Sequence, residues 1–253
     1  MREEWITSRK NPLLVQIRRL ASSRGTRRSA GMFLGDGVKL LEEALKWGAP
    51  LETVVYSEGL DGPELPPEVR TVRVPEDVMA SISPMESPQG ALFLCRMWDT
   101  APPPRLEGGR YLVLDGLQDP GNVGTIWRTA DALEADGLLL VHGCADPFGP
   151  KVVRATMGAC FRLPVWETGP ERLAGLLERS GLALYATALR EDTEDITTAD
   201  LSRSAVVIGS EGRGVSPELL AMSQRAMKIP MRERCESLNA AAAAAVVLWE
   251  MGR

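Results

Sequence analysis

The sequence is poor in the side chains that build metal sites and disulfide frameworks. Its 253 residues contain one histidine, His142, and four cysteines, which are Cys95, Cys144, Cys160 and Cys235. The cysteines are widely separated and include no C-x-x-C pair, so the sequence indicates neither a disulfide framework nor a zinc site. A lone imidazole cannot form a multi-histidine metal site, and we expect no metal. His142 follows the apolar residues 138–141 and is interpreted as a strand-end residue.

Long apolar segments are also missing. No run approaches the roughly 20 apolar residues that a membrane-spanning helix requires, and residues 1–5 lack the apolar core of a signal peptide. Hydrophobic residues nevertheless make up 44% of the chain, which is enough for a substantial core. We expect a folded globular protein that is soluble and located in the reducing cytoplasm.

The chain has no overall excess of positive charge, but one end is basic. The formal net charge is −5, whereas residues 1–28 contain eight Lys or Arg and two Glu. A charge run of this kind is more often a solvated surface than a binding site. A local positive excess is also what contact with nucleic acid requires, so the composition alone leaves both interpretations open.

The segment of residues 99–109 is rich in proline and glycine and predicts a linker. Before it, residues 1–98 combine helical periodicity with strand-like runs at 53–56, 71–74 and 91–97, which predicts a small α/β domain. After it, strand-like runs at 111–114, 137–141, 182–186, 205–208 and 226–229 alternate with helices. Residues 110–253 are therefore predicted to form a mostly parallel sheet with helices on both faces. Ligands of such sheets bind beyond the carboxyl ends of the strands.

Polar residues follow the strand ends in three segments of this second half. The first, residues 119–130, reads DPGNVGTIWRTA. Its glycines allow the backbone to approach a ligand closely. Asn122 could be simply a helix N-cap, but Arg128 carries five donors suited to a phosphate or a ribose.

The second and third segments also have ordinary structural explanations. Residues 208–214, IGSEGRG, match neither common phosphate-binding motif. A turn explains the glycines around Glu211 equally well, with Ser216 and Pro217 opening the next helix. Residues 229–240, IPMRERCESLNA, precede a run of alanines that favours a closely packed helix, and Ser237 is predicted to be its N-cap.

Taken in order, the three segments resemble the signature motifs of the SpoU (TrmH-like) branch of the SPOUT RNA methyltransferases. Those motifs are N-x-G-x-x-x-R-T-A, then (I/V)-G-x-E-x-x-G, then (I/V)-P-M followed by S-L-N-x-x-x-(A/S), and they span roughly residues 110–251 here. In the first half, Asn11-Pro12, Arg27 and the segments 33–37 and 87–90 resemble the family's substrate-recognition domain. Asp36 stands where the family more often has glutamate, and the helix after the first motif ends at residues 132–136 without the glycine that is frequent there. Trp127 stands where an aliphatic residue is usual; it could be a base-stacking surface, although a buried core tryptophan is the commoner arrangement.

This resemblance implies an enzyme that moves a methyl group from S-adenosylmethionine to a ribose 2′-hydroxyl of RNA. The catalytic domain of residues 110–253 would contain a deep C-terminal trefoil knot and form a homodimer. By matching positions, the cofactor would be held by Gly209, Ile229, Met231, Ser237, Leu238, Asn239 and Ala240. The residues expected at the reaction centre are Asn122, Arg128, Glu211, Ser237 and Asn239.

Residues 1–98 would bind the RNA, and the expected contacts are Arg18, Arg19, Arg24, Arg27 and Arg28, with Arg154 completing a site across the dimer. A domain of this size favours ribosomal RNA over transfer RNA by analogy. A guanidinium normally stays protonated, so we expect Arg128 to bind phosphate, with Ser237, Asn239 or water taking the hydroxyl proton. Two rival hypotheses are an RNA-binding protein without catalysis and a Rossmann-type nucleotide-binding enzyme, and the latter lacks its glycine fingerprint.

Overall fold

The computed structural model describes residues 4–188, 193–232 and 237–253, so Cys235 lies outside the described residues. The chain divides into two compact units. The first contains residues 1–98 together with 146–161, and the second contains 99–145 together with 162–253. The sequence predicted a single division at the linker, and the structure differs because residues 146–161 pack with the first unit.

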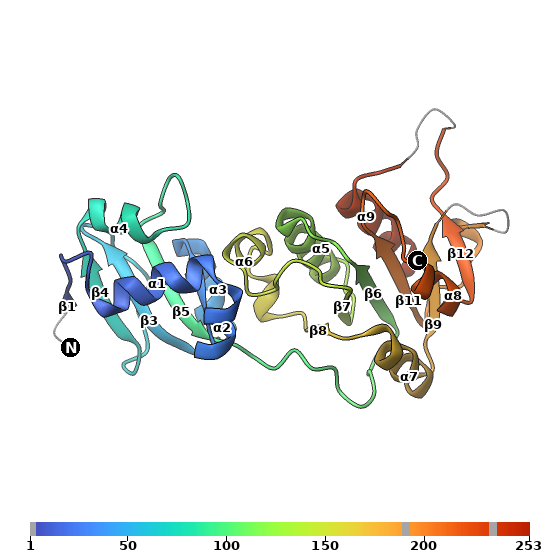
Figure 1. Ribbon diagram of the computed structural model, residues 1–253, viewed down its shortest axis with the longest axis horizontal. Helices are drawn as coiled ribbons and strands as arrows, with labels where there is room; N and C mark the ends of the chain where they lie inside the picture. Colours follow the sequence, from blue (N-terminus) through green and yellow to red (C-terminus); the bar gives the residue numbers. More distant parts are fainter. Residues whose placement is uncertain (1–3, 189–192, 233–236) are drawn as a thin grey trace. The chain divides into compact units, whose positions relative to one another are not determined.

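The first unit is built on a five-stranded mixed sheet (Figure 1) with the order β1-β4-β3-β5-β2. Its strands are β1 (Glu4–Trp5), β2 (Met32–Asp36), β3 (Leu51–Ser57), β4 (Arg70–Val74) and β5 (Ala91–Arg96). Strand β5 runs antiparallel to both β2 and β3. The helices of residues 1–98 are α1 (Pro12–Ser22), α2 (Arg24–Ala30), α3 (Val38–Lys46) and α4 (Glu76–Ile82).

Both faces of this sheet are buried, as expected for strands rich in apolar residues. On one face Leu34, Val55 and Leu92 pack with apolar side chains of α1 and α4 in one core cluster. The periodic residues Leu13, Leu14, Ile17 and Leu20 form the buried stripe of α1, as predicted. Asn11 caps that helix by accepting a hydrogen bond from the Leu13 amide at 2.9 Å.

Residues 146–161 join the first unit through an aromatic cluster. They include α6 (Pro150–Ala155) and a short 3-10 helix, Ala159–Phe161. The Phe148 ring lies 5.3 Å from the ring of Phe33 in β2 and 4.7 Å from that of Trp98. Close aromatic contacts of this kind add to the free energy gained by burial. This packing explains why the segment belongs with a sheet more than 50 residues earlier in the chain.

The second unit is an α/β layer with seven strands in the order β10-β12-β9-β11-β6-β7-β8. Every pairing in it is parallel, which confirms the predicted parallel sheet. Its strands are β6 (Arg110–Asp115), β7 (Gly137–Val141), β8 (Val165–Glu167), β9 (Ala183–Thr187), β10 (Glu194–Asp195), β11 (Ser204–Gly209) and β12 (Arg225–Lys228). The central strands are short buried apolar runs, as a sheet covered on both faces demands.

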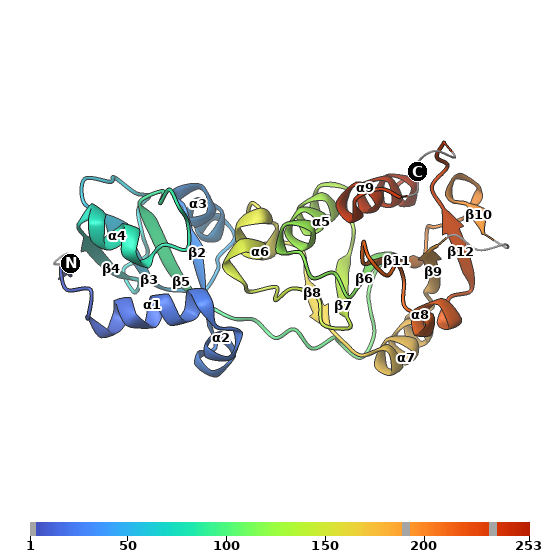
Figure 2. The same cartoon turned by 45° about the horizontal axis from the view of Figure 1, so that its top comes forward.

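Helices cover both faces of this sheet (Figure 2). Helices α5 (Pro120–Ala132) and α9 (Ala240–Met251) lie side by side on one face. Helices α7 (Pro170–Ser180) and α8 (Pro217–Met222) lie on the other face. A short 3-10 helix is formed by Ile196–Thr198 and contacts α9. The alanines of α9 allow its close approach to α5, because they present almost no side-chain bulk.

No helix within residues 4–188, 193–232 and 237–253 has the length and apolar character needed to cross a membrane. Nor do the described residues bring together three His, Cys, Asp or Glu side chains that could hold a metal ion.

Candidate active site

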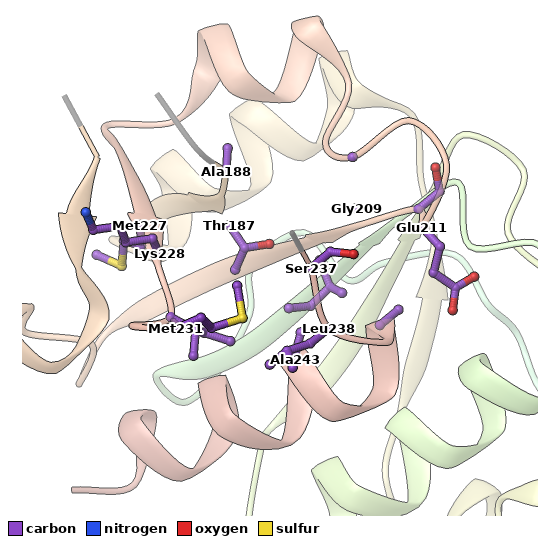
Figure 3. Close-up of a pocket in the computed structure, with 15 residues that line it drawn as sticks. Thr187, Ala188, Gly209, Glu211, Met227, Lys228, Met231, Ser237, Leu238 and Ala243 are labelled. Carbon is purple, nitrogen blue, oxygen red and sulfur yellow. The ribbon is translucent and has the colours of Figure 1, made fainter. Parts of the chain in front are cut away.

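A cavity of about 290 Å³ lies at the carboxyl ends of β9, β11 and β12 (Figure 3). Its walls come from three segments far apart in the sequence: the end of β9, the turn after β11, and the chain from β12 to the start of α9. Six of the seven predicted cofactor residues line it, namely Gly209, Ile229, Met231, Ser237, Leu238 and Ala240. Ile208, Met227 and Met231 make much of the wall apolar, while Thr187, Lys228 and Ser237 add polar groups. Parallel sheets bind their ligands at this edge.

The turn after β11 is shaped by Gly209. A Cβ atom at this position would lie 2.2 Å from the backbone carbon of Gly214. Ser210 and Gly214 bridge across the turn through two backbone hydrogen bonds of 3.1 and 2.8 Å. Gly214 has a φ of +67°, a left-handed conformation that favours glycine. The glycines around Glu211 therefore make a tight turn, as one of the two interpretations of the sequence predicted. The same turn is also a wall of the cavity.

Three predicted catalytic residues meet beside the cavity. Asn122 donates from Nδ2 to Oε1 of Glu211. Asn239 donates from Nδ2 to the same Glu211 oxygen at 3.0 Å and to Oδ1 of Asn122 at 3.1 Å. The Glu211 carboxylate thus accepts from both amides, and we call these three side chains the Asn122–Glu211–Asn239 cluster. In Figure 3 the Glu211 side chain lies at one end of the cavity, apart from Met227 and Lys228.

Helix capping fixes the orientation of Asn239. Its Oδ1 accepts hydrogen bonds from the amides of Ala241 at 2.9 Å and Ala242 at 3.3 Å. An asparagine that caps with its oxygen must turn its NH₂ group the other way, which here is toward Glu211. The sequence predicted Ser237 as the N-cap of this helix, and that prediction is wrong. The cap is Asn239, because the helix begins only at Ala240.

Asn122 is likewise not a helix cap. Helix α5 begins at Pro120, and Asp119 caps it by accepting a hydrogen bond from the Asn122 amide at 2.7 Å. The Asn122 side chain is therefore left to join the cluster. A capping role alone would not explain this asparagine.

Arg128 lies further along the same helix and outside the cluster. Six residues separate it from Asn122, which is about 9 Å along the helix axis. Arg128 is exposed, and no hydrogen bond or ion pair joins it to another described residue. Its neighbour Trp127 is fully buried and donates from Nε1 to the Leu163 carbonyl at 3.0 Å. Trp127 is therefore a core residue, and a base-stacking role for it is excluded by burial.

Comparison with known proteins identifies the family of the chain. Residues 109–249 match the SpoU rRNA Methylase family, and residues 11–92 match an MRM3-like substrate binding domain. The chain belongs to the SpoU rRNA methylase family. It is 37% identical to an uncharacterized tRNA/rRNA methyltransferase of Synechocystis sp., over 98% of this chain and 93% of the relative. It is 32% identical to the 23S rRNA (guanosine(2553)-2′-O)-methyltransferase RlmP of Bacillus subtilis, over 97% of this chain and 98% of the relative.

A solved structure gives the same result for the fold. The AdoMet-bound rRNA methyltransferase from Sinorhizobium meliloti superposes with a TM-score of 0.86 at 30% identity, covering 98% of this chain and 97% of that one. The family resemblance read from the three motifs is therefore confirmed. The parallel α/β architecture of the methylase is confirmed with it.

The arginines predicted to bind RNA have unequal surroundings in this methylase. Arg19, Arg24 and Arg28 are exposed, and the Arg28 guanidinium lies 5.5 Å from the centre of the Phe148 ring. Arg18 is half-buried and donates to the carbonyl of Arg9. Arg154 in α6 is also half-buried and contacts the sulfur of Met85.

The structure corrects the prediction for Arg27. Only 5% of this residue is exposed. Its Nε and second terminal nitrogen lie 2.9 and 2.6 Å from Oδ2 of Asp146, and its other nitrogen donates to the Leu20 carbonyl at 2.6 Å. All three nitrogens are engaged inside the first unit. Arg27 therefore holds residues 146–161 to α1 and α2 and has no face to offer a phosphate.

Sequence reasoning missed a second polar network at the same edge of the sheet. Asp115 ends β6, and its Oδ1 lies 2.6 Å from Nδ1 of His142, which follows β7. Nε2 of His142 lies 3.2 Å from Oε2 of Glu218 in α8. Asp115 raises the pKa of His142 above its ordinary value, mainly through this hydrogen bond. The strand-end position of His142 was predicted, and an acidic residue at the end of the neighbouring strand could have indicated its partner.

Proposed function

We propose that this methylase transfers a methyl group from S-adenosylmethionine to a ribose 2′-hydroxyl of ribosomal RNA. The observation that carries the proposal is the cavity at the sheet edge with the Asn122–Glu211–Asn239 cluster at one end. The cluster puts a carboxylate and two amides within hydrogen-bond distance of one another. Such a cluster can orient a cationic or polar group at a fixed point.

The residues of the cavity fit S-adenosylmethionine. Small-molecule sites are mostly apolar hollows of about 300–1,000 Å³ with a few placed polar groups, and this one lies just below that range at about 290 Å³. Ile208, Ile229 and Leu238 supply apolar surface for a flat base. The Glu211 carboxylate at one end suits the positive charge of the methionine part. A glycine at position 209 lets the turn after β11 close against Gly214, because a Cβ atom there would lie 2.2 Å from the Gly214 backbone carbon, and this turn forms one wall of the cavity.

The reaction needs orientation more than it needs an unusual catalytic group. S-adenosylmethionine, when bound, would supply an electrophilic methyl group for the 2′-oxygen, with S-adenosylhomocysteine as the leaving group. Ser237 or water would accept the hydroxyl proton. Asn122 and Asn239 hold the Glu211 carboxylate in place. The guanidinium of Arg128 binds the phosphate beside the reacting ribose, which fixes that ribose for in-line attack.

Ribosomal RNA is the proposed substrate for two reasons. The family model and the Bacillus subtilis relative carry rRNA in their descriptions, and the relative's match covers nearly the whole of both chains. The exposed Arg19, Arg24 and Arg28 of the first unit would contact the RNA backbone. A map of 2′-O-methylation in cells with and without the gene identifies the nucleotide, and a map without any difference in ribosomal RNA contradicts this choice.

A homodimer completes the proposal, with Arg154 of each chain serving the site of the other. In support, Trp249 of α9 is 62% exposed and lines a hollow of about 220 Å³ with Leu133, Leu248 and Arg110. A large apolar side chain in such a hollow suits a second copy. Mixing an inactive Arg128→Ala chain with an inactive Arg154→Ala chain should restore activity, because one site of each mixed dimer is then intact. No restoration contradicts the sharing of sites.

Two finer features belong to the same proposal. The chain from β12 to α9 would be threaded as a deep trefoil knot, which the three separate walls of the cavity support, although knots are rare in proteins. The enzyme would act in the cytoplasm. A crystal structure with bound cofactor tests the first feature, and cell fractionation tests the second.

The first experiment is calorimetric titration of the purified protein with S-adenosylmethionine. Saturable binding supports the proposal and justifies the search for the RNA target. If the folded protein shows no binding, with or without bulk RNA, the enzyme hypothesis fails. An RNA-binding protein without catalysis would then be the better hypothesis, and retained RNA binding would identify it.

A further inference from the structure

Asp115 contacts both ends of the segment 209–216, which we call the cavity loop. Through its backbone, Asp115 is the register partner of Gly209, where β11 ends. Through its side chain, Oδ2 accepts a hydrogen bond from the Ser216 amide at 2.6 Å. The Asp115 side chain is almost completely buried. The cavity loop between these two points carries Glu211 and supplies Gly209, Ser210 and Gly214 to the cavity wall.

His142 extends this attachment to the next helix. It bridges Oδ1 of Asp115 at 2.6 Å and Oε2 of Glu218 at 3.2 Å. Glu218 lies in the first turn of α8, two residues after Ser216. The imidazole therefore joins the strand that holds the cavity loop to the helix that follows the loop. Its φ of +54° is uncommon for a residue other than glycine, and it aims the ring at these two carboxylates.

We propose that His142 is a positioning residue, whose protonated form holds the cavity loop, through Asp115 and Glu218, in the shape that binds S-adenosylmethionine. The inference rests on the proposed function, because it concerns the same cavity. An imidazolium donates from both ring nitrogens, whereas a neutral imidazole donates from only one. Loss of the proton therefore leaves one carboxylate without its donor and loosens one connection.

The direction of the pH dependence follows from the surroundings of the ring. The titratable groups that face it are Asp115 from β6 and Glu218 from α8, and the hydrogen bond to Asp115 is the main cause of its raised pKa. Two residues further along its own segment, the Cys144 thiol donates to the Leu114 and Val141 carbonyls. Because the folded protein favours protonated His142, the full stabilisation of the cavity loop is present at a pH below the ordinary histidine pKa of about 6.5. This stabilisation is lost as the pH rises through the raised pKa of His142.

The single histidine of the chain makes the test direct. NMR titration of the imidazole, with and without saturating S-adenosylmethionine, gives the pKa of one group in each state. Linkage requires that a cofactor favouring the protonated form raises this pKa. A rise of about 0.5 corresponds to affinity about threefold weaker above the pKa than below it. Calorimetric affinity measured from pH 5.5 to 8.5 should show the same change.

Two variants separate this role from general stability. His142→Asn keeps a side-chain amide donor beside Asp115 but does not titrate, so we expect the component of the pH dependence due to His142 to vanish. Glu218→Gln should lower the imidazole pKa and reduce the linkage. If the pKa is the same with and without cofactor, or if His142→Asn keeps the wild-type pH profile, the inference is wrong. Absence of cofactor binding at every pH would instead contradict the proposed function.

Discussion

Asn239 and Asn122 are 117 positions apart in the sequence, yet Nδ2 of the first lies 3.1 Å from Oδ1 of the second. Each asparagine stands at the beginning of a helix, α9 in one case and α5 in the other. Both amides also donate to the Glu211 carboxylate, which comes from the turn after β11. The beginnings of two helices and the turn after β11 are thereby joined at one end of the cavity. Substitution of any one of the three residues should therefore alter the orientation of the other two side chains.

Replacement of Asn239 should affect helix capping and cofactor binding separately. Asn239→Ala removes the cap, at about 1 kcal/mol of stability, and also removes both donors to the cluster. Hydrogen bonds to a charged group contribute about 1.5–3 kcal/mol, so cofactor affinity should fall about tenfold or more. Asn239→Ser is the matched variant, because a serine still caps the helix but lacks the amide that donates to Glu211. We expect Asn239→Ser to be more stable than Asn239→Ala but to bind the cofactor equally weakly in calorimetry, and normal binding would contradict the role of the cluster.

Arg128 should matter for catalysis and not for cofactor binding. The residue is exposed and has no hydrogen bond or ion pair with the described residues, so Arg128→Ala should change stability by less than about 0.5 kcal/mol. Methyl transfer to RNA should fall by about 100-fold or more, because the charge that holds the phosphate beside the reacting ribose is lost. Thr125→Ala, at another exposed position of α5, is the control. If Arg128→Ala keeps wild-type turnover, Arg128 is not part of the catalytic site.

The central strands of the second unit could be predicted from local sequence because they are short and mostly apolar. Residues 111–115 and 204–208 are buried throughout, as expected for strands covered on both faces. The three polar segments at the strand ends could be found for the same reason. Their order along the chain then identified the family.

Long-range partners could not be predicted in this way. The basic run of residues 1–28 does not reveal that Arg27 is buried and Arg28 exposed. The burial of Arg27 depends on Asp146, which is 119 positions away. The cap of α9 was misplaced by two residues because both Ser237 and Asn239 are good N-cap residues. The network of Asp115, His142 and Glu218 also joins three segments that are remote in sequence.

A side chain at Gly209 should close the cavity turn. In Gly209→Ala the added Cβ would lie 2.2–2.4 Å from backbone atoms of Gly214 and Val215, so the turn must move. We expect overpacking to lower stability by about 1–3 kcal/mol and cofactor affinity to fall about tenfold or more. Gly212→Ala in the same turn is the control, because nothing lies within 4 Å of the added atom there. Equal cofactor affinity in the two variants would show that the turn does not shape the site.

The buried ion pair between Arg27 and Asp146 should be a determinant of stability in the first unit and not of RNA affinity. Their side chains are 6% and 10% exposed. Removing one partner of a buried pair leaves the other charge without compensation, which costs about 3–5 kcal/mol. We therefore expect Arg27→Ala to lower the urea midpoint strongly, and the double change Arg27→Met with Asp146→Leu to recover much of the loss.

Arg19→Ala should leave stability unchanged but weaken RNA binding and reduce the salt dependence by about one phosphate contact. Arg27→Ala, measured at a temperature where it is folded, should keep the wild-type salt dependence. If instead Arg27→Ala is as stable as the wild type and loses the salt-dependent contact, then Arg27 contacts RNA and the pair with Asp146 does not hold residues 146–161 in place.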